Sequence, residues 1–96
     1  MGNNAVAVGY QNNYFDDTNP VGVGENSTAV GVGNQASGNY SAAVGYSNIA
    51  SDTLSVALGV SNTVVNGGNS NFQGAATIGV SNQAIAEQSV AVGMSN

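Results

Sequence analysis

Small and apolar residues alternate along this chain in six short segments, and each segment has a glycine at the same place. An aliphatic residue stands directly before that glycine, an apolar or aromatic residue directly after it, and an asparagine three places after it. Because successive side chains of an extended strand point to opposite faces, this period of two predicts β-strands and argues against helices. The segments are residues 5–12, 27–34, 41–48, 55–62, 75–82 and 89–96.

The segments recur at a nearly fixed spacing. Their glycines are Gly9, Gly31, Gly45, Gly59, Gly79 and Gly93, with a weaker copy at Gly22, and three of the intervals are 14 residues long. Fourteen residues allow about two short strands and two turns, which is one turn of a thin coil. The predicted fold class is therefore all-β, a parallel β-roll or solenoid of about 14 residues per coil that occupies residues 1–96 as one domain.

Two stretches depart from this regularity. Residues 13–26 are expected to form an irregular coil or turn, because Pro20 interrupts the copy around Gly22. Residues 63–74 are rich in asparagine and glycine and account for the one interval of 20, so they are expected to be an inserted loop.

The alternation also predicts which side chains are buried. Positions three before, one before and one after each glycine should share one face, and the core is expected at the position directly before the glycine. These core residues are Val8, Val30, Val44, Leu58, Ile78 and Val92. The opposite face carries mainly serine and alanine, which would permit another backbone to approach closely.

The repeated glycine and asparagine have backbone reasons. A tight corner needs positive φ or leaves no room for a Cβ atom, which favours glycine. Asparagine tolerates left-handed turns, and stacked asparagine amides can form a ladder of hydrogen bonds. We expect this ladder or turn role for six asparagines: Asn12, Asn34, Asn48, Asn62, Asn82 and Asn96.

Composition points to self-association. Hydrophobic residues make up 42% of the chain, but most are alanine and valine, and there is no cysteine or histidine for a disulfide or a structural zinc. A lone core of such small side chains would bury little apolar area. The stability is therefore expected to come from other copies of the chain, in an obligate homo-oligomer that could also join end to end.

Charge narrows the function classes. The chain has no Lys, Arg or His and five acidic residues, for a net charge of −5. Nucleic-acid binding and attachment to anionic membranes both depend on cationic side chains, so neither is expected. No catalytic site or cofactor is expected either, because no serine has a basic partner and Asp52 and Glu87 are predicted at separate, exposed corners.

Other candidate sites lie in the irregular parts. Asp16 and Asp17 could supply oxygen ligands to Ca²⁺, although a solvated turn before Pro20 is the favoured reading. Exposed aromatic residues are candidate contact points, with the filling of gaps in the coil as the alternative. These aromatic residues are Tyr14, Phe15, Tyr40 and Phe72, while Tyr10 and Tyr46 occupy expected packing positions.

No segment reaches the length of a transmembrane helix, and residues 1–4 have neither basic residues nor a continuous apolar region. Neither membrane insertion nor a signal peptide is therefore expected within these residues. The chain could be a piece of a larger secreted protein, or a complete small protein such as a virion component.

The repeat unit resembles a known family. Ser-Val-Ala-Leu-Gly at 55–59, Ala-Ala-Thr-Ile-Gly at 75–79 and Ser-Val-Ala-Val-Gly at 89–93 are similar to the head repeat of YadA-type trimeric autotransporter adhesins, and the resemblance runs from Ala5 to Asn96. It implies a left-handed parallel β-roll, three chains wound about a common axis, and apolar residues buried within each coil and between chains. Similar repeats occur in phage tail fibres.

The resemblance implies the function. A head module of a trimeric bacterial surface fibre would be extracellular and would attach to surfaces or extracellular matrix through a protein or glycan partner. The alternative is a structural protein of a phage virion or another fibre. The chain shows no stalk, neck or anchor segment, and its lack of basic residues weakens the case for collagen-like or glycosaminoglycan ligands.

Overall fold

All regular elements among the described residues are β-strands. The computed structural model describes residues 6–12, 26–65, 74–85 and 88–96. Six long strands are β1 (Val6–Tyr10), β2 (Thr28–Val32), β4 (Ala42–Tyr46), β6 (Val56–Val60), β8 (Ala76–Val80) and β10 (Val90–Met94). Four short strands are β3 (Gln35–Ala36), β5 (Ile49–Ala50), β7 (Thr63–Val64) and β9 (Gln83–Ala84). The predicted all-β class is confirmed.

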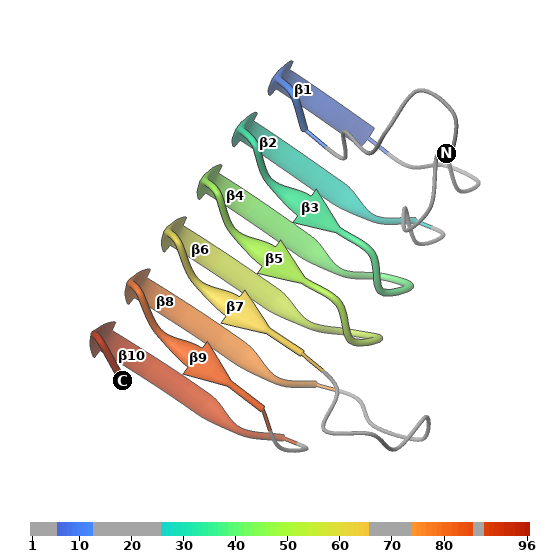
Figure 1. Cartoon of the computed structure of the whole chain (residues 1–96). Helices are drawn as coiled ribbons and strands as arrows, with labels where there is room; N and C mark the ends of the chain where they lie inside the picture. The colour runs from blue at the N-terminus through green and yellow to red at the C-terminus, as the bar shows by residue number, and fades with distance from the viewer. Residues whose placement is uncertain (1–5, 13–25, 66–73, 86–87) are drawn as a thin grey trace.

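The strands form two parallel sheets. The long strands pair in the order β1-β2-β4-β6-β8-β10, and the short strands in the order β3-β5-β7-β9. A coil consists of one long strand, a turn and one short strand, and Figure 1 shows the coils stacked from β1 to β10 with the short strands in front of the long ones. This arrangement is the predicted parallel β-roll.

The register aligns the repeated glycines in one column. Gly9 lies opposite Gly31, and the same pairing continues through every long strand to Gly93. The interval of 22 from Gly9 to Gly31 does not disturb this register, because β1 pairs directly with β2. Nor do the six extra residues before Gly79, although β7 occupies the first two positions of the expected insertion.

The interior of the roll is lined by the small-residue face, which corrects the predicted core. Alanine fills most of it, and within one chain the aliphatic residues before the glycines lie outside. Val8, Ile78 and Val92 are 55%, 43% and 60% exposed, and Val30, Val44 and Leu58 are half-buried. The buried apolar residues are Ala29, Ala36, Ala43, Ala50, Ala57, Val64, Ala75 and Ala84. A coil of 14 residues encloses too little space for larger side chains at most positions.

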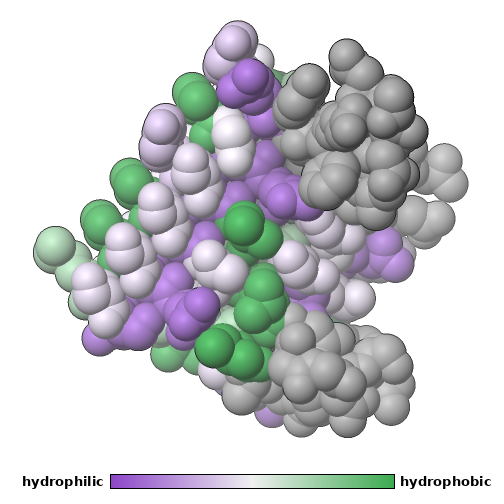
Figure 2. Space-filling view, viewed as in Figure 1, coloured by the Kyte–Doolittle hydropathy of each residue, from purple (hydrophilic) through white to green (hydrophobic). Residues whose placement is uncertain are grey.

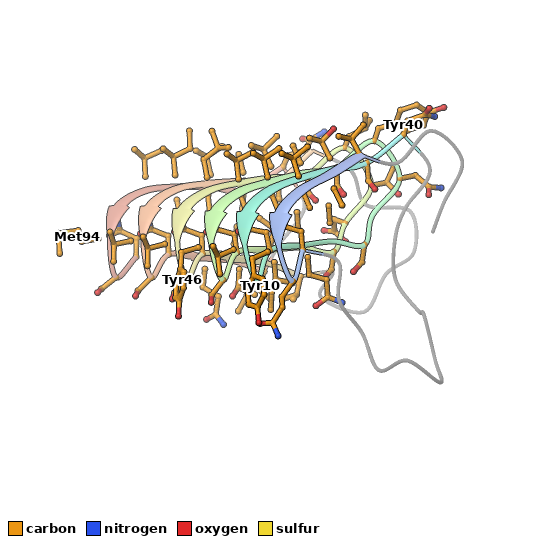
Figure 3. All side chains as sticks on the ribbon, turned by 90° about the horizontal axis from the view of Figure 1, so that it is seen from above. Tyr10, Tyr40, Tyr46 and Met94 are labelled. Carbon is orange, nitrogen blue, oxygen red and sulfur yellow. The ribbon has the colours of Figure 1, made fainter. Side chains whose placement is uncertain are left out.

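The repeated glycine also interrupts the alternation. Its φ angle is between 119° and 127° in all six long strands, which is outside the β region. The residue after the glycine is therefore carried to the curled end of the strand. Figure 3 shows Tyr10, Tyr46 and Met94 at these ends, away from the row of side chains that covers the six-stranded sheet. The predicted face of three positions is thus corrected: only the residues three and one before the glycine share a face, and the residue after the glycine does not.

Candidate assembly surface

The asparagine column is a continuous hydrogen-bonded ladder inside the roll. The Nδ2 group of Asn62 donates to the carbonyl oxygen of Leu58 (2.8 Å) in its own coil and to that of Gly79 (2.8 Å) in the next coil. Its Oδ1 accepts a hydrogen bond from the backbone N–H of Asn82 (3.0 Å). Because a backbone N–H can only donate, this contact identifies Oδ1 and fixes the orientation of the amide.

The same pattern repeats along the column. Each asparagine from Asn12 to Asn82 accepts from the backbone N–H of the next one, at 3.0 to 3.2 Å. Four of these asparagines are buried: Asn34, Asn48, Asn62 and Asn82. Because the glycine breaks the regular strand, the amides satisfy backbone groups that the sheet would otherwise leave unpaired.

Glycine is required at its column for two reasons. At Gly59, φ is +123°, a conformation that side chains rarely adopt, and a Cβ atom would lie 2.0 Å from the carbonyl oxygen of Gly79 and 2.9 Å from Nδ2 of Asn62. The glycine therefore lets the next coil and the asparagine amide approach the backbone. The glycine and asparagine anchors have a structural role in each coil.

The outer face of the six-stranded sheet is a regular apolar surface. We define it as the residues three and one before each glycine, and every one of them is exposed or half-buried. The outer face consists of Val6, Val8, Thr28, Val30, Ala42, Val44, Val56, Leu58, Ala76, Ile78, Val90 and Val92. Thr28 is its only polar residue, and it contains no charge.

The edge beside the outer face is also apolar. It is formed by the residues directly after the glycines, and all six are exposed. The expectation that Tyr10 and Tyr46 occupy packing positions within the chain is therefore wrong. The edge column consists of Tyr10, Val32, Tyr46, Val60, Val80 and Met94. Two apolar surfaces thus meet at the ends of the long strands. Figure 2 shows the side with the short strands, where hydrophilic and hydrophobic residues are interspersed instead.

Two further columns of described residues adopt the left-handed conformation. One lies two residues after the glycine and the other five before it, at the turns between strands. At the first position are Gln11, Gly33, Ser47, Ser61, Ser81 and Ser95, with φ from 54° to 65°. At the second are Asn26, Tyr40, Leu54, Gly74 and Gln88, with φ from 52° to 86°. Tyr40, a predicted contact residue, is exposed at the second turn.

Asp52 differs from its expected position at an exposed corner. It is only 3% exposed, and burial raises the pKa of its carboxyl above the usual value of 3.8 because the charged form is poorly solvated there. Its backbone carbonyl accepts hydrogen bonds from the hydroxyl (2.6 Å) and the N–H (3.3 Å) of Ser55. The chain holds no cationic side chain to pair with this carboxylate.

Several predicted residues lie outside the described part of the chain. These are the calcium candidates Asp16 and Asp17, the aromatic residues Tyr14, Phe15 and Phe72, and Glu87. The described residues contain no cluster of three or more acidic, cysteine or histidine side chains that could hold a metal ion. Among them there is also no helix of the length and apolarity that crossing a bilayer requires.

Reasoning from the sequence missed the buried hydroxyls and the strained turns. The hydroxyls of Ser27, Ser37 and Thr77 are buried without a hydrogen-bond partner among the described residues. An alignment of the segments by their glycines would have shown that Thr77 occupies a position held by alanine in the other five. Nothing in the sequence marks Tyr40 and Leu54 as left-handed, since both residue types disfavour that conformation.

The sequence of this repeat matches a known family. The family model described as YadA head domain repeat matches residues 23–48, 36–62 and 78–96. These ranges include the glycines from Gly31 to Gly59 and both C-terminal glycines of the column. Searches of curated proteins and of solved structures returned no match.

Proposed function

We propose that this chain, which belongs to the YadA head domain repeat family, assembles as a homotrimer and serves as the structural and adhesive head module of a surface fibre. The family relates the chain to structural adhesin modules rather than to enzymes. The observation that carries the proposal is the outer face, which presents repeated aliphatic side chains to solvent in the single chain.

The outer face is more hydrophobic than the interior of the roll. The interior is filled mainly by alanine, serine and asparagine, with Val64 as its largest apolar residue, whereas the Val, Leu and Ile residues of the long strands lie outside. Full burial of one such aliphatic side chain contributes about 1.5–3 kcal/mol. Covering a face of mostly half-exposed aliphatics would then contribute on the order of 10 kcal/mol per chain, comparable with the stability of a whole small domain.

The arrangement of the apolar surfaces favours a closed ring of chains, and the family supports three as its number. The edge column lies at the strand ends, away from the row of side chains that forms the outer face (Figure 3), so one chain would offer two adjoining apolar surfaces to two neighbours. Contacts between unlike surfaces generate closed rings when the rotation permits. A face-to-face dimer would cover the outer face and leave the edge column exposed.

Native mass measurement tests the assembly. We expect three times the chain mass of 9.4 kDa, with no dissociation on dilution to low micromolar concentration. The double variant Val44→Asp/Leu58→Asp should lose the trimer, because each introduced carboxylate would have to be buried without a partner. The matched control Gln35→Asp/Thr63→Asp alters the outer side of the short strands and should remain trimeric. A wild-type chain that is monomeric at these concentrations would refute the assembly.

The family supports a role in adhesion, and the net charge of the chain narrows the class of surface to which it would attach. A trimer with a net charge of −5 per chain and no cation would repel acidic glycans, so neutral protein or glycan surfaces are the preferred partners. The test is retention of the purified trimer on immobilised matrix proteins and on neutral and acidic glycans. The aspartate double variant serves as control, since it lacks multivalency. Retention on none of them, together with end-to-end fibres, would favour a role as a fibre building block.

A further inference from the structure

A periodic interface does not by itself fix how neighbouring chains align along the roll. Successive coils are about 4.8 Å apart, and the outer face repeats nearly the same side chains at that interval. A shift of one chain by one coil would bring Val, Leu and Ile against similar residues. Register must therefore be set by residues that differ between coils.

Tyr40 and Leu54 are two such departures, and they lie at the margin of the outer face opposite the edge column. Both stand five residues before a glycine, where other coils have Asn26, Gly74 and Gln88. Tyr40 is 58% exposed and Leu54 is 48% exposed, so neither packs fully within the chain. They belong to adjacent coils near the middle of the roll.

Their backbone conformation is unfavourable for these residue types. Tyr40 has φ 58° and Leu54 has φ 60°, in the left-handed region where glycine and asparagine are preferred. The turn imposes this conformation, since Gln88 adopts it at the equivalent position of another coil. Tyr40 and Leu54 nevertheless present exposed apolar side chains there, and strained positions of this kind often mark functional contacts.

The two turns stack closely and are joined by hydrogen bonds. The N–H of Leu54 donates to the carbonyl oxygen of Asn39 (2.9 Å) in the adjacent turn. The hydroxyl of Ser41 donates to the carbonyl oxygen of Gly38 (2.6 Å), and a Cβ atom at Gly38 would lie 1.9 Å from the carbonyl oxygen of Asp52. Closely stacked turns of this kind reduce the entropy lost on association.

The position of Tyr40 connects these turns to the outer face. Figure 3 shows Tyr40 on the same side of the ribbon as the row of side chains over the six-stranded sheet, and on the other side from Tyr10 and Tyr46. The margin, which we define as the described residues five before each glycine, carries no charge, and neither does the outer face. An uncharged, apolar surface suits contact between copies of a chain whose net charge is −5.

We infer that Tyr40 and Leu54 are register-determining contacts between copies of this chain: each inserts against the neighbouring copy and selects one alignment of the rolls. The inference rests on the proposed trimer. It assigns the strained turns to a contact with a second copy and not with an external ligand.

The experiment uses the variant Tyr40→Asn/Leu54→Asn, which places at both turns the residue that Asn26 supplies in another coil. Asparagine suits the left-handed conformation, so if Tyr40 and Leu54 acted only within their own turns, the double variant would fold with no loss of stability. The chain has no cysteine, so a spin label at Ser61→Cys, an exposed position, reports distances between chains. We expect a single distance for an in-register trimer and several distances in the double variant, with a trimer dissociation constant raised roughly tenfold or more.

The control is Ser81→Asn, which introduces the same residue at an exposed left-handed position away from the margin (φ 57°). It should keep the single distance. A single distance and unchanged affinity in the double variant would overturn the inference while leaving the trimer intact, whereas a monomeric parent chain would overturn the proposed function itself. In the trimer, a tryptophan in Tyr40→Trp should be shielded from acrylamide, and free quenching would also overturn the inference.

Discussion

The two faces of the long strands belong to the same repeat but carry side chains of different size: small ones on the inner face and larger apolar ones on the outer face. The inner face holds Ala43 and Ala57 at 0% exposure, and size is its constraint because the coil encloses little space. The outer face holds Val44 and Leu58, half-exposed in the single chain, and hydrophobicity is its constraint. The comparison shows that in this thin roll the smaller apolar residues of the long strands line the interior, and the larger ones remain on the outside, where the proposed neighbouring copies would cover them.

The sharpest test of this comparison exchanges size between neighbouring positions. Ala43→Leu should prevent folding or lower the free energy of unfolding by about 3 kcal/mol or more, because three added carbons have no space in the interior. Val44→Leu, one residue away on the outer face, should cost less than about 1.5 kcal/mol, as a near-volume-conserving swap does. Thermal unfolding monitored by circular dichroism measures both. Equal tolerance at the two positions would contradict the assignment of inner and outer faces.

The second test concerns the polar part of the interior. Asn62→Ala removes the acceptor of the Asn82 N–H and the donor to the carbonyl oxygens of Leu58 and Gly79. We expect a loss of about 2–4 kcal/mol, since each buried group left unpaired costs about 1–3 kcal/mol. Chemical denaturation measures this loss.

The matched control is Asn96→Ala at the exposed end of the ladder. Its side chain donates to the carbonyl oxygen of Val92 in an exposed setting, so we expect a loss below about 1 kcal/mol. Similar losses at the two positions would show that the amides act independently of their burial in the column.

The third test addresses the one threonine in the alanine column. Thr77 is fully buried and its Oγ1 has no hydrogen-bond partner among the described residues. Thr77→Val keeps the shape and removes the unpaired hydroxyl, so we expect an increase in stability of about 1 kcal/mol. Thr77→Ala should instead destabilise, because it leaves a cavity between coils. A less stable valine variant would indicate that the hydroxyl forms a hydrogen bond in solution.

The smallest effect should be a pH dependence from Asp52. Burial raises the pKa of its carboxyl above 3.8, so the folded chain holds the proton more tightly than the unfolded chain does. The contribution to stability is therefore fully present below pH 3.8 and is lost as the pH rises through the raised pKa. Asp52→Asn should remove this part of the dependence in unfolding curves measured across acidic pH. An unchanged slope in the variant would place the titration on other carboxyls.

Much of the fold follows from the repeat, but the direction of burial does not. Alternation and the spacing of 14 predicted parallel strands, and the glycines and asparagines do align in two columns. The sequence could not tell which face was interior, because alternation assigns side chains to two sides without saying how far apart the two sheets lie. Hydrophobicity favoured the valine side, and the small volume of the coil placed alanine inside.

At the turns, the sequence likewise failed to predict the burial of Asp52 and the backbone conformation of Tyr40. Asp52 was expected in solvent because carboxylates are seldom buried, yet the turn that holds it is covered by the adjacent coil. Tyr40 was singled out as an aromatic residue in an irregular segment, but its left-handed backbone and its place beside the outer face depend on the stacking of turns from different coils.

The amino-acid sequence alone determined the secondary structure, the length of the coil, the columns of glycine and asparagine and the absence of cationic chemistry, because these depend on local spacing and residue type. Only the tertiary structure decided which face encloses the core, which backbone groups each amide satisfies, and which apolar residues remain exposed on the outside of the roll. These properties depend on distances between coils, and those distances are set when the whole roll is stacked.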